Sequence, residues 1–448
     1  MSQDQLRIGI LSDDFYPHSG GVSRSIEQQI DHLVALGHEV TLFAPQWELE
    51  PPTNCRWVAL PQWRLPGTPS YLCSLAAHPA LARRLVEEHD LDVVHSQNER
   101  GSLYLGAMMA RAAGIPQVHT FHSNYVGTHH TNTVSSGFNS LTYLPLTPRL
   151  LGLAGGRPDV AVRLPLTPAA HEDSVHARRD WRNLARISAG VDAFTSPAGY
   201  MIDCIVDAAP GLAGRGHVVP SGINPLFAAA TRRRDPADRR IRIVTCSRLG
   251  SEKRVDVLVR AFAELDRPDA ELVIIGTGPA EAGLRRLAEA IPGDRVRFLG
   301  RLDTAEVAAQ MADADIYVLA SYHFDTQGMV LAEAAAAGAP ILYCDERLQV
   351  GVSPQNSLLT GPSPAELAAG LATLADDPER RRRMSQASRE ASLRFTGETM
   401  ARAYVAVYRQ AIDRVNGRSS TPDGVATAPP HPRSPQRPRS ASRSRPAG

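Results

Sequence analysis

Residues 316–340 read I-Y-V-L-A-S-Y-H-F-D-T-Q-G-M-V-L-A-E-A-A-A-A-G-A-P, which is the pattern of a strand, a loop and a helix. The apolar run Ile316–Leu319 predicts a buried strand, and the Ala-rich run beyond the polar loop predicts a helix that ends near Gly338. Gly328 stands where the loop enters that helix, a place where the backbone turns sharply or approaches a ligand closely. This pattern predicts one unit of an alternating α/β fold.

The first turn of the predicted helix has the chemistry of an anion site, because its backbone N–H groups are unpaired and the helix dipole is positive there. Asp325 in the loop and Glu333 inside the helix stand eight residues apart around it. A carboxylate accepts two hydrogen bonds at once and therefore suits neighbouring sugar hydroxyls. Phosphate donors flanked by such acceptors fit a nucleotide-sugar. A turn glycine and a solvated glutamate are the alternative interpretation.

The rest of the second half repeats the alternation of strands and helices. Apolar runs predict strands, and amphipathic runs between them predict helices. The strands are Ile241–Cys246, Leu272–Ile275, Val296–Leu299 and Ile341–Tyr343, and the clearest helices are Val255–Leu265 and Ala280–Ala290. Such alternation predicts a parallel sheet with helices on both faces, and ligands of these sheets bind at the carboxyl ends of the strands.

Three loops at that edge carry residues suited to a nucleotide-sugar. Arg248 and Lys253, five residues apart after the first strand, can converge on a diphosphate, Arg as a planar fork and Lys as a point charge. Gly276 and Gly278 in G-T-G-P allow a flat ring to approach the backbone, and Leu299–Gly300 offers the same. Solvated loop charges are the alternative interpretation for Arg248 and Lys253.

The first half of the chain shows the same alternation. Leu6–Leu11 predicts a strand, residues 25–36 a helix and Glu39–Ala44 the next strand, and the first loop of this βαβ unit holds Gly20–Gly21. Further strands are predicted at Asp92–His95, Gln117–Thr120, Val191–Thr195 and His217–Gly222, with a helix over Ser102–Ala113. The loop does not read GxGxxG, so a nicotinamide dinucleotide is not indicated. We expect two doubly wound domains with the active site between them.

Three segments of the first half leave alternatives open. His122 stands just beyond a predicted strand, where a structural histidine and a working one are equally expected. The stretch from Gly137 to Thr167 has the character of a loop. Residues 176–187, H-A-R-R-D-W-R-N-L-A-R-I, predict an Arg-rich helix. Its Arg178–Arg186 stretch either meets lipid phosphates at a membrane surface or belongs to an ordinary helix that packs on the core, which we favour.

Composition argues against several classes of function. The 448 residues suffice for two or three domains, and a net charge of +1 leaves no nucleic-acid footprint. The five cysteines form no CxxC pair, which favours buried thiols in a reduced, cytoplasmic protein. His129–His130 lacks the spacing of metal ligands, so no metal site is expected. We expect neither a signal peptide nor a membrane-spanning run of about 18 apolar residues.

Several motifs stand in one order along the chain, namely Gly-Gly-Val in the first loop, R-x4-K, G-x-G-P and the two carboxylates eight residues apart. Over roughly Ile8 to Tyr408, this combination resembles a GT-B glycosyltransferase of family 4. The segments V-V-H-S-Q at Val93–Gln97, H-T-F-H-S-N-Y at His119–Tyr125 and T-Q-G at Thr326–Gly328 look most like the diacylglycerol glucosyltransferases.

The resemblance implies the GT-B fold, in which two Rossmann-like, doubly wound α/β domains face each other across a cleft. We expect the acceptor-side domain at 1–222, a linker at 223–240 and the nucleotide-sugar-binding domain at 241–395. A helix at 396–415 is then expected to cross back to the first domain, followed by a disordered basic tail at 416–448. That tail either contacts an anionic membrane or only improves solubility.

The resemblance also implies a retaining hexosyltransferase that needs neither a metal nor a cofactor. It implies a nucleotide-sugar donor, with UDP-glucose favoured, and a lipid acceptor such as diacylglycerol at the inner face of the cell membrane. Arg248 and Lys253 would hold the donor diphosphate, Asp325 the donor sugar, and His122 would face the reacting carbon. The implied donor-binding residues are Gly20 and Gly21 over the phosphates, Gly276, Gly278, Leu299 and Gly300 around the base, Gly328 and Met329 on the phosphates, and Glu333 on the ribose.

One position departs from the family, which usually has Glu where this chain has Asp325. The carboxylate is then set back by about one carbon–carbon bond, ~1.5 Å. A compensating loop, a different sugar or a slow enzyme would each account for it. Two alternative functions follow. One is a family 4 transferase that uses GDP-mannose or another donor with a soluble or polyprenyl-linked acceptor, and the other is a non-catalytic nucleotide-sugar-binding protein.

Overall fold

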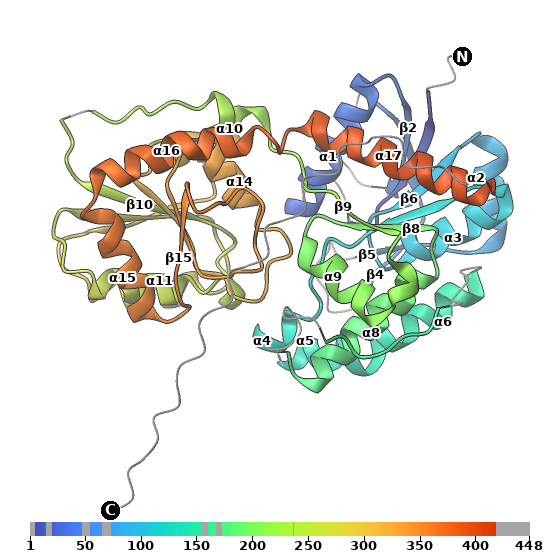
Figure 1. Cartoon of the computed structure of the whole chain (residues 1–448), viewed down its shortest axis with the longest axis horizontal. Helices are drawn as coiled ribbons and strands as arrows, with labels where there is room; N and C mark the ends of the chain where they lie inside the picture. The colour runs from blue at the N-terminus through green and yellow to red at the C-terminus, as the bar shows by residue number, and fades with distance from the viewer. Residues whose placement is uncertain are drawn as a thin grey trace, which may run out of the picture.

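The computed structural model describes residues 5–14, 20–46, 54–64, 73–131, 133–154, 160–166, 173–235 and 237–417, without the side chains of 130–135. The chain forms two lobes that lie side by side (Figure 1). Each lobe is built around a parallel sheet, as the alternating pattern predicts. The predicted basic tail lies outside the described residues beyond position 417.

The first sheet joins seven parallel strands of the described chain in the order β3-β2-β1-β6-β7-β8-β9. Their bounds are β1 Arg7–Leu11, β2 Glu39–Pro45, β3 Arg56–Leu60, β6 Val93–Ser96, β7 Gln117–Thr120, β8 Ala193–Ser196 and β9 Gly216–Val218. An antiparallel pair, β4 (Gln62–Arg64) and β5 (Cys73–Leu75), is separate from it. The predicted strands are confirmed to within two residues, except that β9 ends four residues earlier than expected.

The second sheet joins six parallel strands in the order β12-β11-β10-β13-β14-β15. Their bounds are β10 Ile241–Cys246, β11 Ala270–Ile275, β12 Val296–Gly300, β13 Ile316–Leu319, β14 Ile341–Tyr343 and β15 Ser357–Leu359. In both sheets the strand order reverses at the first strand, since β1 lies between β2 and β6, and β10 between β11 and β13. Loops on the two sides of such a reversal diverge and form a ligand crevice, and here they carry the predicted site.

Helices connect the strands in both domains. In the first domain they are α1 Gly21–Ala35, α2 Pro79–Glu88, α3 Gly101–Ala113, α4 Thr128–Thr131, α5 Thr133–Phe138, a π-helical turn η1 Asn139–Tyr143, α6 Leu144–Ala154, α8 Val175–Ala189, α9 Gly199–Ala208 and a 3-10 turn η2 Pro210–Leu212. In the second they are α10 Pro225–Ala229, a 3-10 turn η3 Ser251–Lys253, α11 Val255–Glu264, α12 Glu281–Glu289, α13 Thr304–Ala312, α14 Met329–Ala336, α15 Pro364–Ala375, α16 Pro378–Ser392 and α17 Gly397–Val415. None of the described helices is long and apolar enough to cross a membrane.

The segment after α4 corrects the expectation of a loop between Gly137 and Thr167, because α5, η1 and α6 form a helical run up to Ala154. Leu144, Thr147, Leu151 and Ala154 are buried along one side of α6 at helical spacing. Proline is normally excluded from helix interiors because it removes a hydrogen bond. Pro148 nevertheless lies inside α6, and it hides the apolar period from sequence analysis.

The Arg-rich helix α8 packs its apolar face against the core, which confirms the favoured alternative. Trp181, Leu184 and Ile187 are fully buried. The Trp181 indole N–H donates to Asp173 at 2.8 Å, which satisfies the polar atom of this buried ring. The apolar face of α8 is therefore not available to a membrane.

Helix α17 crosses from the second domain to the first, as the resemblance implied (Figure 1). The Thr396 side chain caps its start, and Met400, Tyr404, Tyr408 and Ala411 are buried against residues of β1, β2 and α1. The first domain is therefore completed by the last helix of the described chain.

We predict that Met400→Ala destabilises the first domain by about 2–5 kcal/mol, because it leaves a cavity under α17. All four tryptophans of the chain stand at or before position 181, so tryptophan fluorescence during urea unfolding reports on the first half of the chain. Gln410→Ala, on the exposed side of the same helix, serves as the control and should change the midpoint little. Equal midpoints for the two variants would contradict the packing of α17.

Candidate active site

The loop His323–Gln327, here called the bridging loop, joins β13 to α14 and connects the two domains. Each of its five residues hydrogen-bonds to the first domain. Asn124 Nδ2 donates to the carbonyls of His323 (3.4 Å) and Phe324 (3.2 Å), Tyr200 Oη to that of Asp325 (3.0 Å), Thr326 Oγ1 to that of His122 (2.8 Å), and Ser221 N to Gln327 Oε1 (3.0 Å). The first domain therefore positions the loop that carries Asp325.

A tight turn at Asn124–Gly127 fits directly against the bridging loop. The Gly127 N–H donates to Asn124 Oδ1 at 3.0 Å, which fixes the amide whose other end holds the loop. A Cβ on Gly127 would lie 2.6 Å from the His323 carbonyl oxygen and 2.9 Å from the Phe324 Cα. Only glycine allows the two backbones to approach this closely.

Lys253 and Asp325, predicted to bind the donor diphosphate and the donor sugar, lie together as an ion pair. Lys253 is the only lysine among the 448 residues. Its ammonium also lies 5.6 Å from the centroid of the Phe324 ring. Asp325 uses Oδ1 for the ion pair, whereas its buried Oδ2 has no hydrogen-bonding partner among the described residues. One carboxylate oxygen therefore remains to accept a hydroxyl.

Arg248 lies at the same sheet edge, but the structure does not bring its guanidinium onto Asp325. It pairs with Glu252, four residues further on, and its side chain is 59% exposed. An exposed ion pair of this kind stabilises little and is easily exchanged. The binding of a diphosphate by Arg248 stays a prediction.

The start of α14 has the backbone geometry of an anion site. Gly328 caps the helix with φ of 67°, a left-handed conformation that other residues adopt only with strain. The first domain reaches this point through the start of α1, where a Cβ on Gly21 would lie 3.6 Å from Met329 Sδ. Gly20 likewise has a positive φ, of 80°. The two Gly-rich loops predicted to enclose the phosphates therefore lie against each other.

Glu333 lies inside α14 and is 6% exposed. Burial raises the pKa of its carboxyl from 4.5 to about 7, and the Arg24 guanidinium from α1 opposes part of that rise. Its negative charge also helps raise the pKa of the Cys246 thiol at the end of β10, after burial as the larger cause. Glu333 thus lies near the end of β10, with the Arg24 cation of the first domain close enough to act on its charge.

The glycines predicted to frame the base have a structural reason of their own. A Cβ on Gly276 would lie 1.9 Å from the Ser247 carbonyl oxygen, and one on Gly278 would lie 2.5 Å from that of Leu249. The Gly276 N–H donates to the Gly300 carbonyl at 2.7 Å, so the loops after β10, β11 and β12 are in direct backbone contact. Close packing explains Gly276 and Gly278, while contact of these loops and of Leu299 with a base stays a prediction.

His122 stands at the end of a chain of buried hydrogen bonds that begins on α17. Gln29 Nε2 donates to Tyr408 Oη (2.8 Å), Gln97 Nε2 donates to Gln29 Oε1 (2.8 Å), and Gln97 Oε1 lies 2.7 Å from His122 Nε2. Because the Gln97 NH2 group donates to Gln29, the Gln97 carbonyl oxygen faces the imidazole and accepts a hydrogen bond from its Nε2–H group. Burial lowers the pKa of His122 to about 4, so the ring is neutral at pH 7.

The residues predicted from the sequence do not include Gln29 and Tyr408, and they include Gln97 only as part of a motif. One signal was present for Gln29. It shares the apolar face of α1 with Ile26, Ile30 and Leu33, where a buried polar side chain needs a partner. Nothing in the sequence indicates that this partner lies on a helix 379 residues further along.

Metal-ligand clusters are not part of this arrangement, since the described residues contain no group of three or more His, Cys, Asp or Glu able to hold a metal ion. His129 instead pairs with Asp180 at 2.8 Å.

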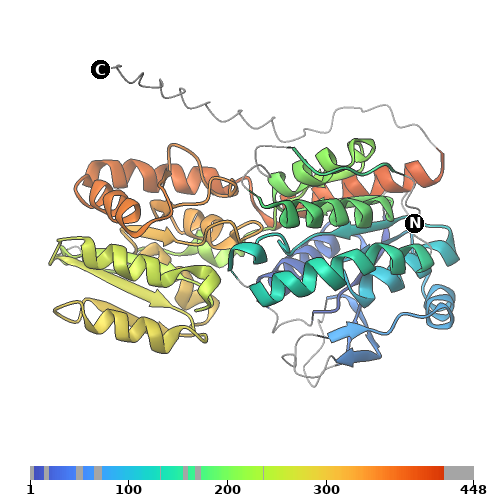
Figure 2. The ribbon, with the colours of Figure 1, turned by 90° about the horizontal axis from the view of Figure 1, so that it is seen from below.

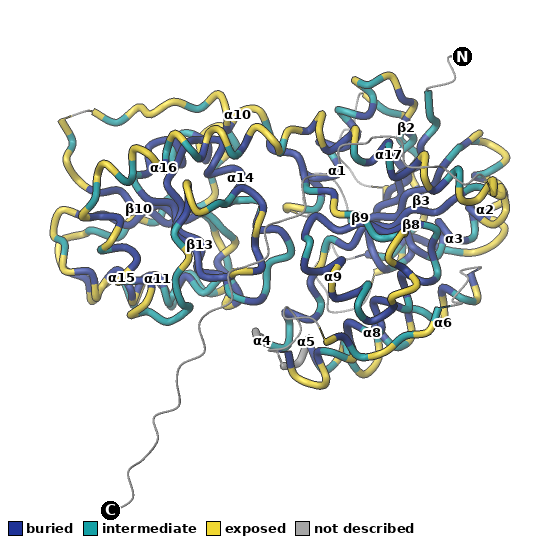
Figure 3. The backbone as a smooth tube through the Cα atoms, viewed as in Figure 1, coloured by how far each residue is buried: buried dark blue, intermediate teal, exposed yellow. Residues whose placement is uncertain are grey.

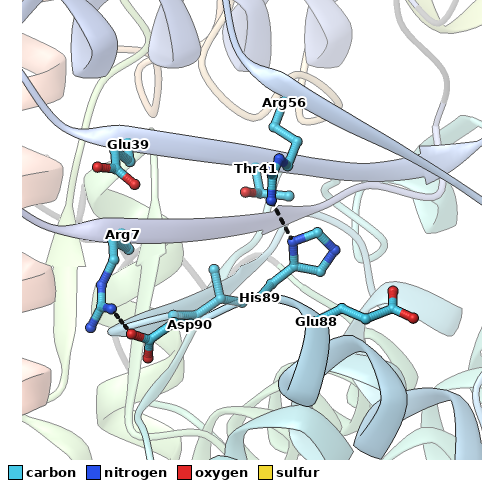
Figure 4. A pocket seen from close by; sticks show the side chains of 8 residues that line it. Arg7, Glu39, Thr41, Arg56, Glu88, His89 and Asp90 are labelled. Atoms are coloured by element: carbon cyan, nitrogen blue, oxygen red, sulfur yellow. Dashed lines mark hydrogen bonds and ion pairs between the residues drawn. The ribbon is translucent and has the colours of Figure 1, made fainter.

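A hollow of about 380 Å³ lies at the opposite edge of the first sheet (Figure 4). It is lined by Arg7, Glu39, Thr41, Arg56, Glu88, His89, Asp90 and Leu91, and contains none of the predicted site residues.

We predict that Gln97→Leu lowers kcat about 100-fold, because a displacement near 1 Å costs about that much and His122 loses its anchor. The Kd of the nucleotide-sugar should stay within about twofold, because His122 would act on the reacting carbon. Gln28→Leu is the matched control, since Gln28 is buried on the same helix as Gln29 but is not part of the series of hydrogen bonds that leads to His122. An unchanged kcat in Gln97→Leu would show that His122 needs no anchor.

We predict that UDP-glucose binds about tenfold more weakly at pH 6 than at pH 8, if only ionised Glu333 accepts the ribose hydroxyls. The diphosphate of this donor does not titrate in that range. Glu333→Gln should remove the dependence, as measured by calorimetry. The free energy of unfolding should change in the opposite direction. The folded protein holds the Glu333 proton more tightly than the unfolded chain does, so this stabilisation is lost as the pH rises from about 4.5 through about 7.

Comparisons with known proteins agree with this geometry. The model of Glycosyltransferase Family 4 matches residues 19–226, and that of Glycosyl transferases group 1 matches residues 229–391. Alpha-monoglucosyldiacylglycerol synthase of Acholeplasma laidlawii is 24% identical, over 92% of this chain and 98% of its own length. A GDP-mannose-dependent alpha-(1-6)-phosphatidylinositol monomannoside mannosyltransferase of Mycolicibacterium smegmatis is 26% identical, over 74% of this chain and 79% of its own.

Solved structures share the fold. Sucrose-phosphate synthase from Thermosynechococcus elongatus superposes with a TM-score of 0.66 at 18% identity, covering 91% of this chain and all of that one. Anabaena Alr3699/HepE, solved in complex with UDP-glucose, gives a TM-score of 0.58 at 17% identity, covering 92% and 100%. With a family 4 domain followed by a group 1 domain, and helix α17 returning to the first, the chain belongs to the GT-B glycosyltransferases of family 4.

Proposed function

We propose that this glycosyltransferase moves glucose from UDP-glucose to a lipid acceptor such as diacylglycerol, with retention at the anomeric carbon and without a metal ion. The observation that carries the proposal is the pairing of Lys253 with Asp325 at the start of α14, on a loop held by the segment that contains His122. A phosphate-binding cation and a hydroxyl-binding carboxylate thus share one place.

The donor occupies the two loops that follow β10 and β13. An ammonium has three N–H donors, so Lys253 can keep Asp325 and still donate to the diphosphate. Together with Arg248 and the N–H groups at the start of α14, it stabilises the negative charge that develops as the sugar leaves. Asp325 accepts donor-sugar hydroxyls through Oδ2, and ionised Glu333 accepts those of the ribose.

The acceptor approaches from the first domain, beside His122. The neutral imidazole carries its proton on Nε2 and donates it in a hydrogen bond to Gln97. Its Nδ1 atom can therefore accept a hydrogen bond from a hydroxyl of the donor sugar or of the lipid acceptor. The leaving phosphate takes the proton of the attacking hydroxyl, so no further base is required. The activities named for the relatives from Acholeplasma laidlawii and Mycolicibacterium smegmatis support a lipid acceptor, which implies a peripheral location at the inner face of the membrane.

A second candidate is a mannosyltransferase that uses GDP-mannose, favoured by the name of the relative from Mycolicibacterium smegmatis. It differs from the first in the base and sugar subsites, and in its acceptor. Asp325 in place of the usual Glu affects which sugar the site accepts, because the ion pair with Lys253 holds this shorter side chain in one position. Parallel assays with several donors separate the two candidates.

We predict that the purified chain forms a glycolipid from UDP-glucose and diacylglycerol in anionic vesicles in excess EDTA, and not from GDP-mannose or UDP-galactose. Lys253→Ala should lower the rate at least about 100-fold, because it removes charge stabilisation in the transition state. Arg260→Ala, an exposed cation one helix further on, is the control. Since Lys253 carries the only side-chain amine, donor should also protect that amine from acetylation. Product from GDP-mannose alone would favour the second candidate, and no product from any donor would contradict both.

A further inference from the structure

Five large apolar side chains lie exposed along one helical run, α5–η1–α6. They are Phe138 (57% exposed), Leu141 (79%), Leu146 (49%), Leu150 (38%) and Leu153 (84%), here called the apolar face. Isolated exposed apolar residues are normal, but these are five of the thirteen in the described residues, and they fall within 16 positions. Figure 2, seen from below, shows this teal segment on the near side of the first domain.

The opposite side of the same segment is already occupied by the core. Leu144, Leu151 and Ala154 are buried in the cluster that contains Trp181. Helix α6 is therefore apolar on two sides, and packing within the chain uses only one of them. Figure 3 shows the exposed stretches of α6 on the outside of the lobe. A second apolar partner is needed to remove the apolar face from water.

Cations gather beside the apolar face. Arg149 is exposed on α6, between Leu146 and Leu150. Burial lowers the pKa of the Arg186 guanidinium on α8, and repulsion from Arg182 and Arg149 lowers it further, so the three charges lie close together. None of the three forms an ion pair with a carboxylate of the described residues. Like charges held together without counterions suit an anionic surface.

Aromatic rings connect the apolar face to the predicted transfer site. The Phe138 ring stacks on Tyr143 with centroids 6.5 Å apart, and Tyr143 lies 5.6 Å from Tyr125. The hydroxyls of Tyr125 and Tyr143 both donate to Glu99, at 2.8 Å to its carboxylate and 2.9 Å to its carbonyl. The negative charge of Glu99 is near enough to His122 to oppose part of the lowering of its pKa by burial. An acceptor in a membrane under the apolar face would therefore be adjacent to the site.

We propose that the apolar face docks the enzyme on an anionic membrane, with Arg149, Arg182 and Arg186 on lipid phosphates, so that the lipid acceptor enters along Phe138, Tyr143 and Tyr125. The inference rests on the proposed lipid acceptor and names the surface that reaches it. Leucines inserted in the interface with arginines at headgroup level are the usual composition of such surfaces. In this arrangement the apolar side chains of α6 meet lipid, whereas those of α8 pack on the core.

The test is sedimentation with vesicles of phosphatidylglycerol and phosphatidylcholine, without any donor. The triple variant Leu146→Ser, Leu150→Ser, Leu153→Ser should lower the vesicle-bound fraction at least about tenfold, because three exposed side chains lose their insertion. The matched control is Leu226→Ser, Leu359→Ser, Leu393→Ser, three leucines of the second domain that are 47%, 44% and 72% exposed. It should bind as the wild type does.

Charge is tested by Arg149→Gln with Arg186→Gln, which should weaken binding to the anionic vesicles and not to vesicles of phosphatidylcholine alone. Tryptophan fluorescence confirms that each variant keeps the first domain folded. Equal binding of the leucine triple variant and the wild type would overturn the inference, as would absence of wild-type binding. A dimer in sedimentation velocity that the triple variant loses would assign the face to a second copy instead.

The docking and the proposed function fail in different ways. Vesicle binding that depends on the apolar face, without sugar transfer from any donor, would leave the docking in place and contradict the proposed function. Glycolipid formed by the triple variant at the wild-type rate would leave the function in place and overturn the docking.

Discussion

The hydrogen bonds between the bridging loop and the first domain are the constraint on which the site depends. Backbone carbonyls of the loop accept from Asn124 and Tyr200, so the contact fixes the main chain and leaves the Asp325 side chain available. Asp325, a residue of the second domain, is thereby positioned by the first domain. Because buried main-chain contacts are costly to break without replacement, the two half-sites keep a defined geometry across a domain boundary.

Much of the fold follows from the sequence, because buried parallel strands are short apolar runs and their loops are rich in Gly and polar residues. The strands at Ile241–Cys246, Ile316–Leu319 and Ile341–Tyr343 have the bounds that their apolar runs predict. Helix α6 escaped prediction, since Pro148 interrupts a period that tertiary packing nevertheless supports. In the site, the Lys253–Asp325 pair brings together two predicted residues 72 positions apart, because strand order places both loops side by side. The Tyr408–Gln29–Gln97 chain could not be predicted, because it joins elements whose proximity only the complete fold creates.

Two carboxylates that looked alike in the sequence are treated differently by the structure. Asp325 lies in a loop and forms an ion pair with the Lys253 ammonium, whereas Glu333 is buried in a helix and the Arg24 guanidinium only partly opposes the rise of its pKa. The raised pKa of Glu333 lets this carboxyl change its protonation near neutral pH. Gly328 and Gly276 both have a positive φ, and Gly276 in addition stands where two loops approach too closely for a Cβ.

The solitary lysine has a consequence for the covalent chemistry of the chain. The other basic side chains counted with it are all arginines, which carry charge but no nucleophilic amine at neutral pH. Every acylation, glycation or ubiquitin attachment that needs a side-chain ammonium can occur only at the ion pair with Asp325. Any modification of this one side-chain amine would therefore also disrupt the ion pair that holds Asp325.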